Sequence, residues 1–333
     1  MIEPWRVQVG VTSGAEDVTR CRPRKDQCGP LGRDVGDLDI AVIEASLTDV
    51  AAQKHYETTQ IINHCPSDWC EYDTSKPWYV TLDAGQASIA MRQRTSPLDM
   101  AVDCKFETKE GSTVEIHLDL QQEGPPLLVW GNGRRALPKG GYNDYYSLTN
   151  LKADGRLRIQ GAEITHDTTV HGVTWMDHEY GGFPASYNWI WNGVRLSNGV
   201  SVLNYTLPRS TFEVGAPIHG QATLLFPDGS SHLVDSSVVV NQPKTMHERQ
   251  YFEEVQIHIG GSATSNQSLP EIEGSLTLKS LMPDQVILGP KGEKNVYEGV
   301  ASCTGSMSPM PGQPAESVTG TAWIEEKFSP VSG

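Results

Sequence analysis

The sequence predicts an all-β fold, and three features of its 333 residues point that way. Apolar segments are short, alternate with a period of two and end at turn residues, as strands with one buried face do. The 32 glycines and 21 prolines make up about 16% of the chain, against an average of roughly 12%, so the chain turns often. Long amphipathic helical patterns are nearly absent, which leaves few elements other than strands to build a core.

Eight segments along the chain carry the strand pattern. In chain order they are residues 38–45, 78–82, 100–106, 113–120, 170–176, 187–194, 200–207 and 222–226. Two other segments depart from this pattern. Residues 48–56 fit two helical turns, and residues 244–256 are an ambiguous second helix candidate. Neither segment alters the all-β class.

The length of the chain favours two domains, because one hydrophobic core usually serves roughly 150 residues. Residues 213–220 read as a linker that follows a long strand. We therefore expect a first β domain over residues 1–215 and a second over residues 216–333.

Composition excludes two classes of partner. Aspartate and glutamate outnumber lysine and arginine by 41 to 26, and a net charge of -15 repels the phosphates of nucleic acid. No apolar run approaches the roughly 18 residues that a membrane-spanning helix needs. We expect neither a nucleic-acid partner nor a membrane span.

The cysteines allow two short local disulfides. The six are Cys21, Cys28, Cys65, Cys70, Cys104 and Cys303. The first two lie in a stretch rich in proline and glycine, and the next two flank a loop of four residues. The alternative is that several are free, buried thiols, which pack as small hydrophobic groups. No CxxC pair occurs, so a zinc ribbon or a thioredoxin-type site has little support.

Two glycosylation sequons bear on the cellular compartment. They begin at Asn204, which reads as a strand residue, and at Asn266, which lies in a loop-like stretch. Together with local disulfides they favour a secreted protein or one in the lumen of the secretory pathway. The first residues lack the basic and apolar regions of a signal peptide. A cytoplasmic location is the alternative.

Several common catalytic motifs are missing. His178-Glu179 is followed by residues 180–182, Tyr-Gly-Gly, where a metalloprotease would place its second histidine. There is no GxSxG nucleophile elbow and no Walker lysine loop. Residues 131–136 match GxGxxA, but one proline and two glycines follow where a helix should run, so we read a turn. His166 and His178 lack a third ligand at a metal-binding spacing. We expect no metal and no cofactor.

The most informative segment is residues 170–179. Strand alternation puts Trp175, Asp177 and Glu179 on one face and His178 on the other. If the first face is buried, desolvation and mutual repulsion would raise the pKa of one carboxyl group, which could then donate a proton. The alternative is that Asp177 caps backbone N–H groups where the strand ends and that Glu179 faces water.

Aromatic residues gather around this segment. Tyr187, Trp189 and Trp191 share one face of the following strand, where they either line an apolar pocket or fill a core. Trp130, directly before the turn at residues 131–136, is a further candidate for contact with substrate. Aromatic side chains at alternate positions of one strand, beside a pair of carboxylates, favour a pocket for an apolar small molecule.

Three motifs lie close together: YYS at residues 145–147, single glycines at 155 and 161, and VHGVTWMDHEYG at residues 170–181. These motifs resemble those of the lipocalin-like family that includes carotenoid hydratases of the CrtC type, the AttH-like proteins and the fungal Diels-Alderases. Weaker matches lie at residues 189–199, 227–229, 296–299 and 318–325. The matches cover residues 125–326 well and the first 120 loosely, and Tyr180 stands where many members have tryptophan.

This resemblance implies two lipocalin-like antiparallel β-barrel or sandwich domains with a hydrophobic pocket and no cofactor. It also implies an apolar polyene, terpenoid or polyketide substrate. In the hydratase branch the general acid is the aspartate that Asp177 matches, with Trp175 beside it and His178 next in the motif. Tyr145 and Tyr146 of the YYS motif join the candidates for contact with substrate.

Three functions remain open. The first is a cofactor-free cyclase of Diels-Alder or hetero-Diels-Alder type in natural-product biosynthesis, which holds a flexible substrate in a reactive fold and can first dehydrate it to a quinone-methide-like diene. The second is an isoprenoid hydratase or dehydratase that uses Asp177 as general acid and Trp175 to stabilise a cation. The third is a non-catalytic carrier of apolar ligands.

Overall fold

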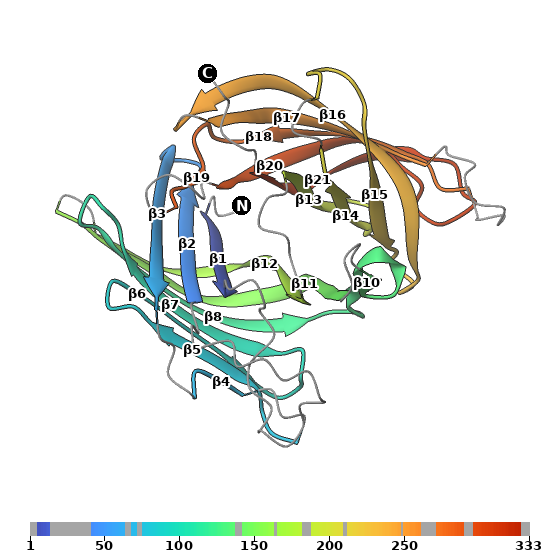
Figure 1. Cartoon of the computed structure of the whole chain (residues 1–333). Coiled ribbons are helices and arrows are strands. Elements are labelled where there is room, and N and C mark those ends of the chain that lie inside the picture. The colour runs from blue at the N-terminus through green and yellow to red at the C-terminus, as the bar shows by residue number, and fades with distance from the viewer. Residues whose placement is uncertain are drawn as a thin grey trace, which may run out of the picture. The chain divides into compact units, whose positions relative to one another are not determined.

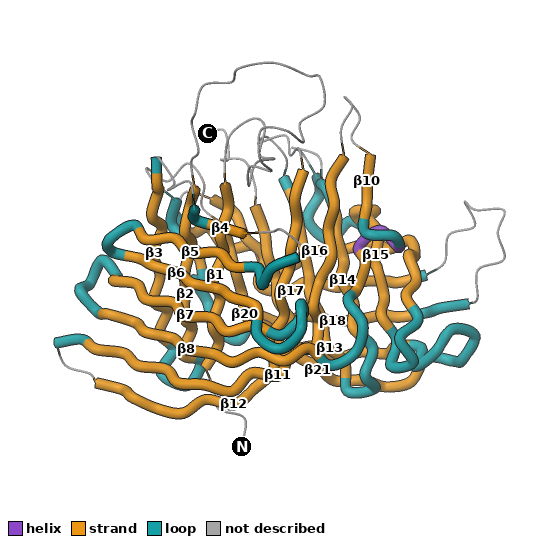
Figure 2. Tube along the Cα trace, turned by 90° about the horizontal axis from the view of Figure 1, so that it is seen from below, coloured by secondary structure: helices purple, strands orange, loops and turns teal. Residues whose placement is uncertain are grey.

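Strands make up nearly all of the regular secondary structure in the computed structural model (Figures 1 and 2), so the predicted all-β class is confirmed. It describes residues 5–13, 41–63, 68–71, 75–136, 142–162, 165–181, 188–208, 212–247, 249–260, 271–289 and 296–327. The chain divides into two compact units. One unit consists of Met1–Glu123, Ala136–Asp144 and Asn150–Phe183, and the other of Gly124–Arg135, Tyr145–Thr149 and Pro184–Gly333.

The first unit contains two antiparallel sheets. The smaller has the order β1 (Trp5–Ser13), β2 (Ala41–Asp49) and β3 (Lys54–Ile62). The larger runs in the order β11, β8, β7, β6, β5, β4, and β12 also pairs with β11. Its strands are β4 (Cys70–Glu71), β5 (Tyr79–Asp83), β6 (Ala87–Gln93), β7 (Met100–Glu107), β8 (Thr113–Gln122), β11 (Tyr142–Gln160) and β12 (Thr165–Gly181).

One face of the larger sheet is apolar and the other is charged. In β8, Val114, Ile116 and Leu118 are buried, while the alternate residues Glu115 and His117 point the other way. The smaller sheet contacts β6 and β7 (Figure 1), which accounts for burial on the apolar side. The period-two pattern of the sequence therefore selects the face that packs.

Gly155 allows β11 and β8 to approach each other. It lies opposite Leu118, and a Cβ atom added at this position would come within 1.9 Å of the carbonyl oxygen of His117. Any side chain would therefore push the two backbones apart. This glycine is one of the single glycines in the motif set, and its role is close strand packing.

The second unit is built on an eight-stranded antiparallel barrel, consistent with the lipocalin-like fold. The order is β18, β17, β16, β15, β14, β13, β21, β20, and β18 also pairs with β20, which closes the barrel. The strands are β13 (Trp189–Leu196), β14 (Ser201–Thr206), β15 (Ile218–Leu225), β16 (Ser231–Met246), β17 (Arg249–Ile259), β18 (Gly274–Ser280), β20 (Val296–Met307) and β21 (Glu316–Lys327).

Short elements accompany the barrel. β19 (Val286–Ile287) pairs with β20, and β9 (Leu127–Leu128), the 3-10 turn η1 (Val129–Gly131) and β10 (Arg134–Ala136) lie before β11 in the chain. The turn η1 contacts β15 and β16. These contacts hold residues 124–135 and 145–149 in the second unit.

Alternation along β13 and β21 separates the inside of the barrel from its outside. Ile190 and Val194 of β13 and Ile324 of β21 belong to the apolar core of the barrel. Trp191 and Glu325, which oppose each other across the two strands, lie on the outer face. A residue and its sequence neighbour in these strands therefore face different environments.

The predicted linker lies within the barrel. Residues 212–217 connect β14 to β15, which are paired neighbours in one sheet. Residues 184–215, which the sequence assigned to the first domain, belong to the second compact unit. A turn rich in glycine and proline has the same composition whether it joins two strands or two domains.

Both helix candidates are strands in the structure. Residues 48–56 comprise the end of β2, a turn and the start of β3, and the turn is held by the Ala52 N–H, which donates to Asp49 Oδ1 at 2.9 Å. Residues 244–256 comprise the end of β16 and most of β17, which pair from Met246 with Arg249 onward. Pairing with neighbouring strands outweighs the local helical pattern.

The cysteines that the structure describes fall into both predicted classes. Cys70 is disulfide-bonded, whereas Cys104 and Cys303 are buried free thiols, and burial raises the pKa of each to about 12. Cys21, Cys28 and Cys65 lie outside the described residues, so the predicted pairings stay predictions.

The sequon at Asn204 is inaccessible in the folded protein. Its side chain is fully buried and donates to Asn192 Oδ1 at 3.2 Å, while Ser236 Oγ donates to its Oδ1 at 2.7 Å. Asn266 lies outside the described residues. Within the described part of the chain, no helix is long and apolar enough to cross a membrane.

Candidate functional site

The WMDHE motif lies near the end of β12, in the first unit, and its side chains alternate as predicted. The indole Nε1 of Trp175 donates to Asp177 Oδ1 at 2.7 Å, so these two side chains share a face. The bond joins residues two apart in the chain, the spacing that a strand brings onto one side. It fixes the carboxylate against the ring.

This face is not buried in the structure. Asp177 and Glu179 are exposed and Trp175 is half-buried. Asn143, which is only 2% exposed, donates from Nδ2 to Glu179 Oε1 at 2.5 Å. Desolvation, on which the sequence-based idea of a protonated carboxyl group depended, therefore does not act on the exposed Asp177.

His178 occupies the opposite face of β12 and is half-buried. Burial lowers the pKa of its imidazole below 6.5, because the charged form loses hydration. The ring is therefore neutral at pH 7. A neutral imidazole can accept a proton or donate a hydrogen bond.

A second group of predicted residues meets in the second unit. The indole Nε1 of Trp191 donates to the hydroxyl of Tyr145 at 2.8 Å. The ring of Tyr145 meets Trp130 edge to face, with 5.7 Å between ring centroids. Tyr145 and Trp191 are buried and Trp130 is half-buried. We call Trp130, Tyr145 and Trp191 the aromatic cluster.

The turn predicted at residues 131–136 positions Trp130. Gly131 and Gly133 have φ of 84° and 78°, and Trp130 itself has φ of 59°, a left-handed conformation that a bulky residue rarely adopts. The backbone N–H of Trp130 donates to Thr223 Oγ1 at 3.0 Å. A turn with a strained residue at its start is often a functional feature.

Trp189 lies beside two charged residues that sequence reasoning did not single out as site residues. Its Nε1 donates to Glu325 Oε1 at 2.6 Å, and Lys327 Nζ lies 4.5 Å from the centroid of its ring. The pairing of β13 with β21 brings these residues together. Only the strand register reveals this contact, since more than a hundred residues separate the partners.

The structure thus places the predicted residues in two groups, one in each unit. Trp175, Asp177, His178 and Glu179 follow one another along β12, and the aromatic cluster belongs to the second unit. Tyr146 is half-buried and pairs with Leu128 of β9, next to the cluster in sequence but on the other face of β11. Tyr187 lies outside the described residues.

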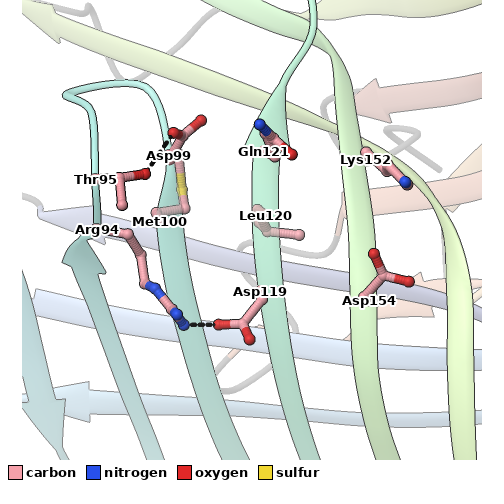
Figure 3. A pocket seen from close by; sticks show the side chains of 9 residues that line it. All are labelled: Arg94, Thr95, Asp99, Met100, Asp119, Leu120, Gln121, Lys152 and Asp154. Carbon is pink, nitrogen blue, oxygen red and sulfur yellow. Dashed lines mark hydrogen bonds and ion pairs between the residues drawn. The ribbon is translucent and has the colours of Figure 1, made fainter.

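A pocket on the charged face of the first unit does not suit an apolar substrate (Figure 3). Arg94 forms an ion pair with Asp119, and the Thr95 hydroxyl donates to Asp99 at 3.0 Å. The lining residues are Arg94, Thr95, Asp99, Met100, Asp119, Leu120, Gln121, Lys152 and Asp154. The described residues hold no group of three His, Cys, Asp or Glu side chains placed to bind a metal ion.

Comparison with known proteins agrees with this architecture. Residues 33–325 match the AttH-like family. The chain belongs to the AttH-like family. The match spans both compact units of this AttH-like protein and both groups of candidate residues. No curated protein matches the chain.

Three solved structures share the fold of this AttH-like protein. A protein from Nitrosomonas europaea that was assigned as AttH has a TM-score of 0.64 and 16% identity, and the match covers 88% of this chain and 82% of that one. Kievitone hydratase from Nectria haematococca has a TM-score of 0.58 and 14% identity, with 87% and 80% covered. CghA has a TM-score of 0.51 and 12% identity, with 88% and 86% covered.

Proposed function

We propose that this AttH-like protein is a cofactor-independent cyclase, of Diels-Alder or hetero-Diels-Alder type, that acts on a hydrophobic terpenoid or polyketide. The observation that carries the proposal is the aromatic cluster. Trp130, Tyr145 and Trp191 are held against one another by a 2.8 Å hydrogen bond and an edge-to-face contact, so the two buried rings support the half-buried Trp130, the ring that a substrate can reach.

A ring held in this way supplies what a cycloaddition needs. The reaction forms two σ bonds from π electrons of the substrate and requires no nucleophile or external electron donor. Its barrier contains the entropy lost when a flexible chain folds so that the diene meets its partner. Rigid aromatic side chains that bind the folded form before reaction lower this barrier. The hydrogen bond from the Trp130 N–H to Thr223 and the edge-to-face contact with Tyr145 hold the ring of Trp130 in place before substrate binds.

The residues of β12 belong to the first unit, and we assign to them a separate step, the loss of water that precedes cyclisation when the substrate is a quinone-methide precursor. Asp177, fixed by Trp175, takes a proton from the substrate as a carboxylate and passes it to the departing hydroxyl, which leaves as water. His178 lies on the opposite face of β12. The substrate loses one water and gains no atoms.

A hydratase is the second candidate, and the fold shared with kievitone hydratase favours it. In that reaction Asp177 would protonate a double bond, Trp175 would stabilise the cation and water would add. The exposure of Asp177 weighs against this role, because the argument for a protonated carboxyl group requires a buried face. The third candidate, a carrier, needs only an apolar surface.

Product analysis separates these functions. The protein is incubated with candidate polyenes and hydroxylated quinone-methide precursors in water enriched in heavy oxygen, and the products are identified by mass spectrometry. We expect an isomer or a dehydrated adduct without the label. A product that contains heavy oxygen would establish a hydratase, and unchanged ligand recovered from a complex would establish a carrier.

Two variants with matched controls test the residues. Trp130→Ala should lower turnover by roughly a hundredfold, since positioning contributes several kcal/mol, whereas Trp78→Ala, at another half-buried tryptophan, should not. Asp177→Asn should slow only substrates that must first lose water. Asp167→Asn, an exposed aspartate of the same strand that pairs with Arg156, is its control. Normal turnover by Trp130→Ala would contradict the proposal.

A further inference from the structure

Glu326 is a carboxyl group inside the barrel of the second unit. It lies on β21 on the same side as Ile324 and is fully buried. Its Oε2 accepts the backbone N–H of Phe252 at 2.9 Å, which links β21 to β17. Its Oε1 has no hydrogen-bond partner among the described residues. A fully buried polar atom without a partner is rare and requires an explanation.

Tyr251 presents a second unpartnered group in the same place. Its side chain is fully buried on β17, and within the described part of the chain its hydroxyl has no hydrogen-bond partner. Burial raises the pKa of this hydroxyl far above 10, so it is a neutral donor at any physiological pH. Removing such a hydroxyl from water without a hydrogen bond is unfavourable, so a bound partner for it would be stabilising.

Three contacts hold these two groups close together. Glu326 and Tyr297 are direct partners across β21 and β20. The ring of Tyr297 lies against that of Tyr251, with 5.5 Å between centroids. The Phe252 N–H that binds Glu326 belongs to the residue after Tyr251. The hydroxyl of Tyr297 is itself satisfied by Ser280 Oγ at 2.7 Å, so the unpartnered atoms belong to Glu326 and Tyr251.

The surroundings keep the carboxyl group protonated. Burial raises the pKa of Glu326 to about 8, and the Phe252 N–H lowers it only in part. At pH 7 the group is therefore mostly a neutral acid with an O–H to donate. The charged neighbours coupled to the two tyrosines are Arg249 and Glu253 on β17 and Asp284 in the turn before β19.

We infer that Glu326 and Tyr251 form a binding site inside the barrel for the carbonyl oxygen of a small, otherwise apolar ligand. Both groups are donors, and one carbonyl oxygen can accept from both, which satisfies the two unpartnered atoms together. The apolar core around them, which includes Val255, Ile257 and Ile324, suits a hydrocarbon body. The interior of an eight-stranded barrel is either filled by side chains or holds one small ligand, and the two unpartnered groups favour the second case here.

This site goes beyond the proposed cyclase activity and does not depend on it. The aromatic cluster includes Trp191 on the outer face of β13, whereas Glu326 lies on the inner face of the neighbouring strand β21. The failure of one proposal therefore leaves the other standing. The chemical class of the ligand is an aryl ketone, an enone or a similar neutral carbonyl compound.

Two probes of nearly equal shape test the inference: acetophenone, which has a carbonyl oxygen, and α-methylstyrene, which has a methylene group in its place. Binding of each to the whole chain is measured by NMR titration at pH 6.5. We expect acetophenone to bind about tenfold more tightly, because it gains two buried hydrogen bonds. Tyr251→Phe should remove most of this preference, and Tyr56→Phe, at a buried tyrosine of the first unit, should retain it.

A second comparison covers the case in which Tyr251→Phe fails to fold. At pH 9.5 Glu326 is ionised and repels the carbonyl oxygen, so the preference of the wild type for acetophenone should fall at least fivefold from its value at pH 6.5. Glu326→Gln keeps a neutral donor and should retain the preference at both pH values. An unchanged preference in Tyr251→Phe, equal binding of the two probes, or no binding of either, as when the site holds only a water molecule, would overturn the inference.

Discussion

Replacing the buried Glu326 by glutamine should change how the stability of the protein depends on pH. The ordinary pKa of this group is 4.5, and burial raises it to about 8 in the folded protein. Between these values the unfolded chain has released a proton that the folded protein still holds. The free energy of unfolding must therefore fall as pH rises through this range.

The size of the effect follows from the two pKa values. Each pH unit between them lowers the free energy of unfolding by about 1.4 kcal/mol. Over the range from 4.5 to about 8 the loss is on the order of 5 kcal/mol, which is a large part of the stability of a typical domain. Below pH 4.5 the carboxyl group is neutral in both states and the loss is absent.

Urea unfolding from pH 5 to pH 9 measures this slope. Glu326→Gln cannot ionise, so its curve should lack the part of the decline that the wild type owes to Glu326, whatever constant offset the amide introduces. Glu325→Gln changes the neighbouring residue on the outer face and should keep the wild-type slope. Equal slopes in the wild type and Glu326→Gln would refute the reasoning that burial keeps this carboxyl group protonated.

Three further predictions concern a half-buried histidine, a closely packed glycine and a buried tyrosine. Because burial lowers the pKa of His178, the folded protein should lose stability as pH falls below 6.5, and His178→Gln should reduce that loss in urea melts between pH 5 and pH 7. Gly155→Ala should lower the free energy of unfolding by several kcal/mol, since its Cβ meets a backbone carbonyl; a melting temperature equal to that of the wild type would contradict this. Tyr145→Phe removes the acceptor of a buried indole N–H and should cost about 1–3 kcal/mol in chemical denaturation, unless the ring shifts to another acceptor.

Strand alternation predicted the arrangement within β12. Side chains two apart in an extended chain must share a face, so Trp175 and Asp177 had to be neighbours, and the 2.7 Å bond between them shows that they are. The burial of that face could not be predicted in the same way. It depends on what packs against the strand, and the structure leaves Asp177 and Glu179 exposed.

The turn at residues 131–136 is a similar case. Its glycines predicted a turn, and Gly131 and Gly133 do adopt left-handed backbone conformations. No sequence pattern indicated that the turn brings the ring of Trp130 against Tyr145. That contact requires the hydrogen bond from Trp130 to Thr223, a residue far along the chain.

The helix candidates failed for a related reason. Residues 48–56 and 244–256 each contain a local helical pattern, but in the structure they form hairpins whose strands pair with their neighbours. Local preference is worth a few tenths of a kcal/mol per residue, and a ladder of backbone hydrogen bonds with one buried face outweighs it.

What the amino-acid sequence determined by itself is the class of fold and the side of each strand on which a residue lies, because both follow from the period of the extended backbone. Short motifs in the sequence also indicated the AttH-like family. The tertiary structure alone decided which side is buried and which distant residues meet. Glu326, Tyr251 and Tyr297 lie on three strands. Only the register of the closed barrel brings Glu326 Oε1 close to the Tyr251 hydroxyl, and neither atom has a hydrogen-bond partner among the described residues.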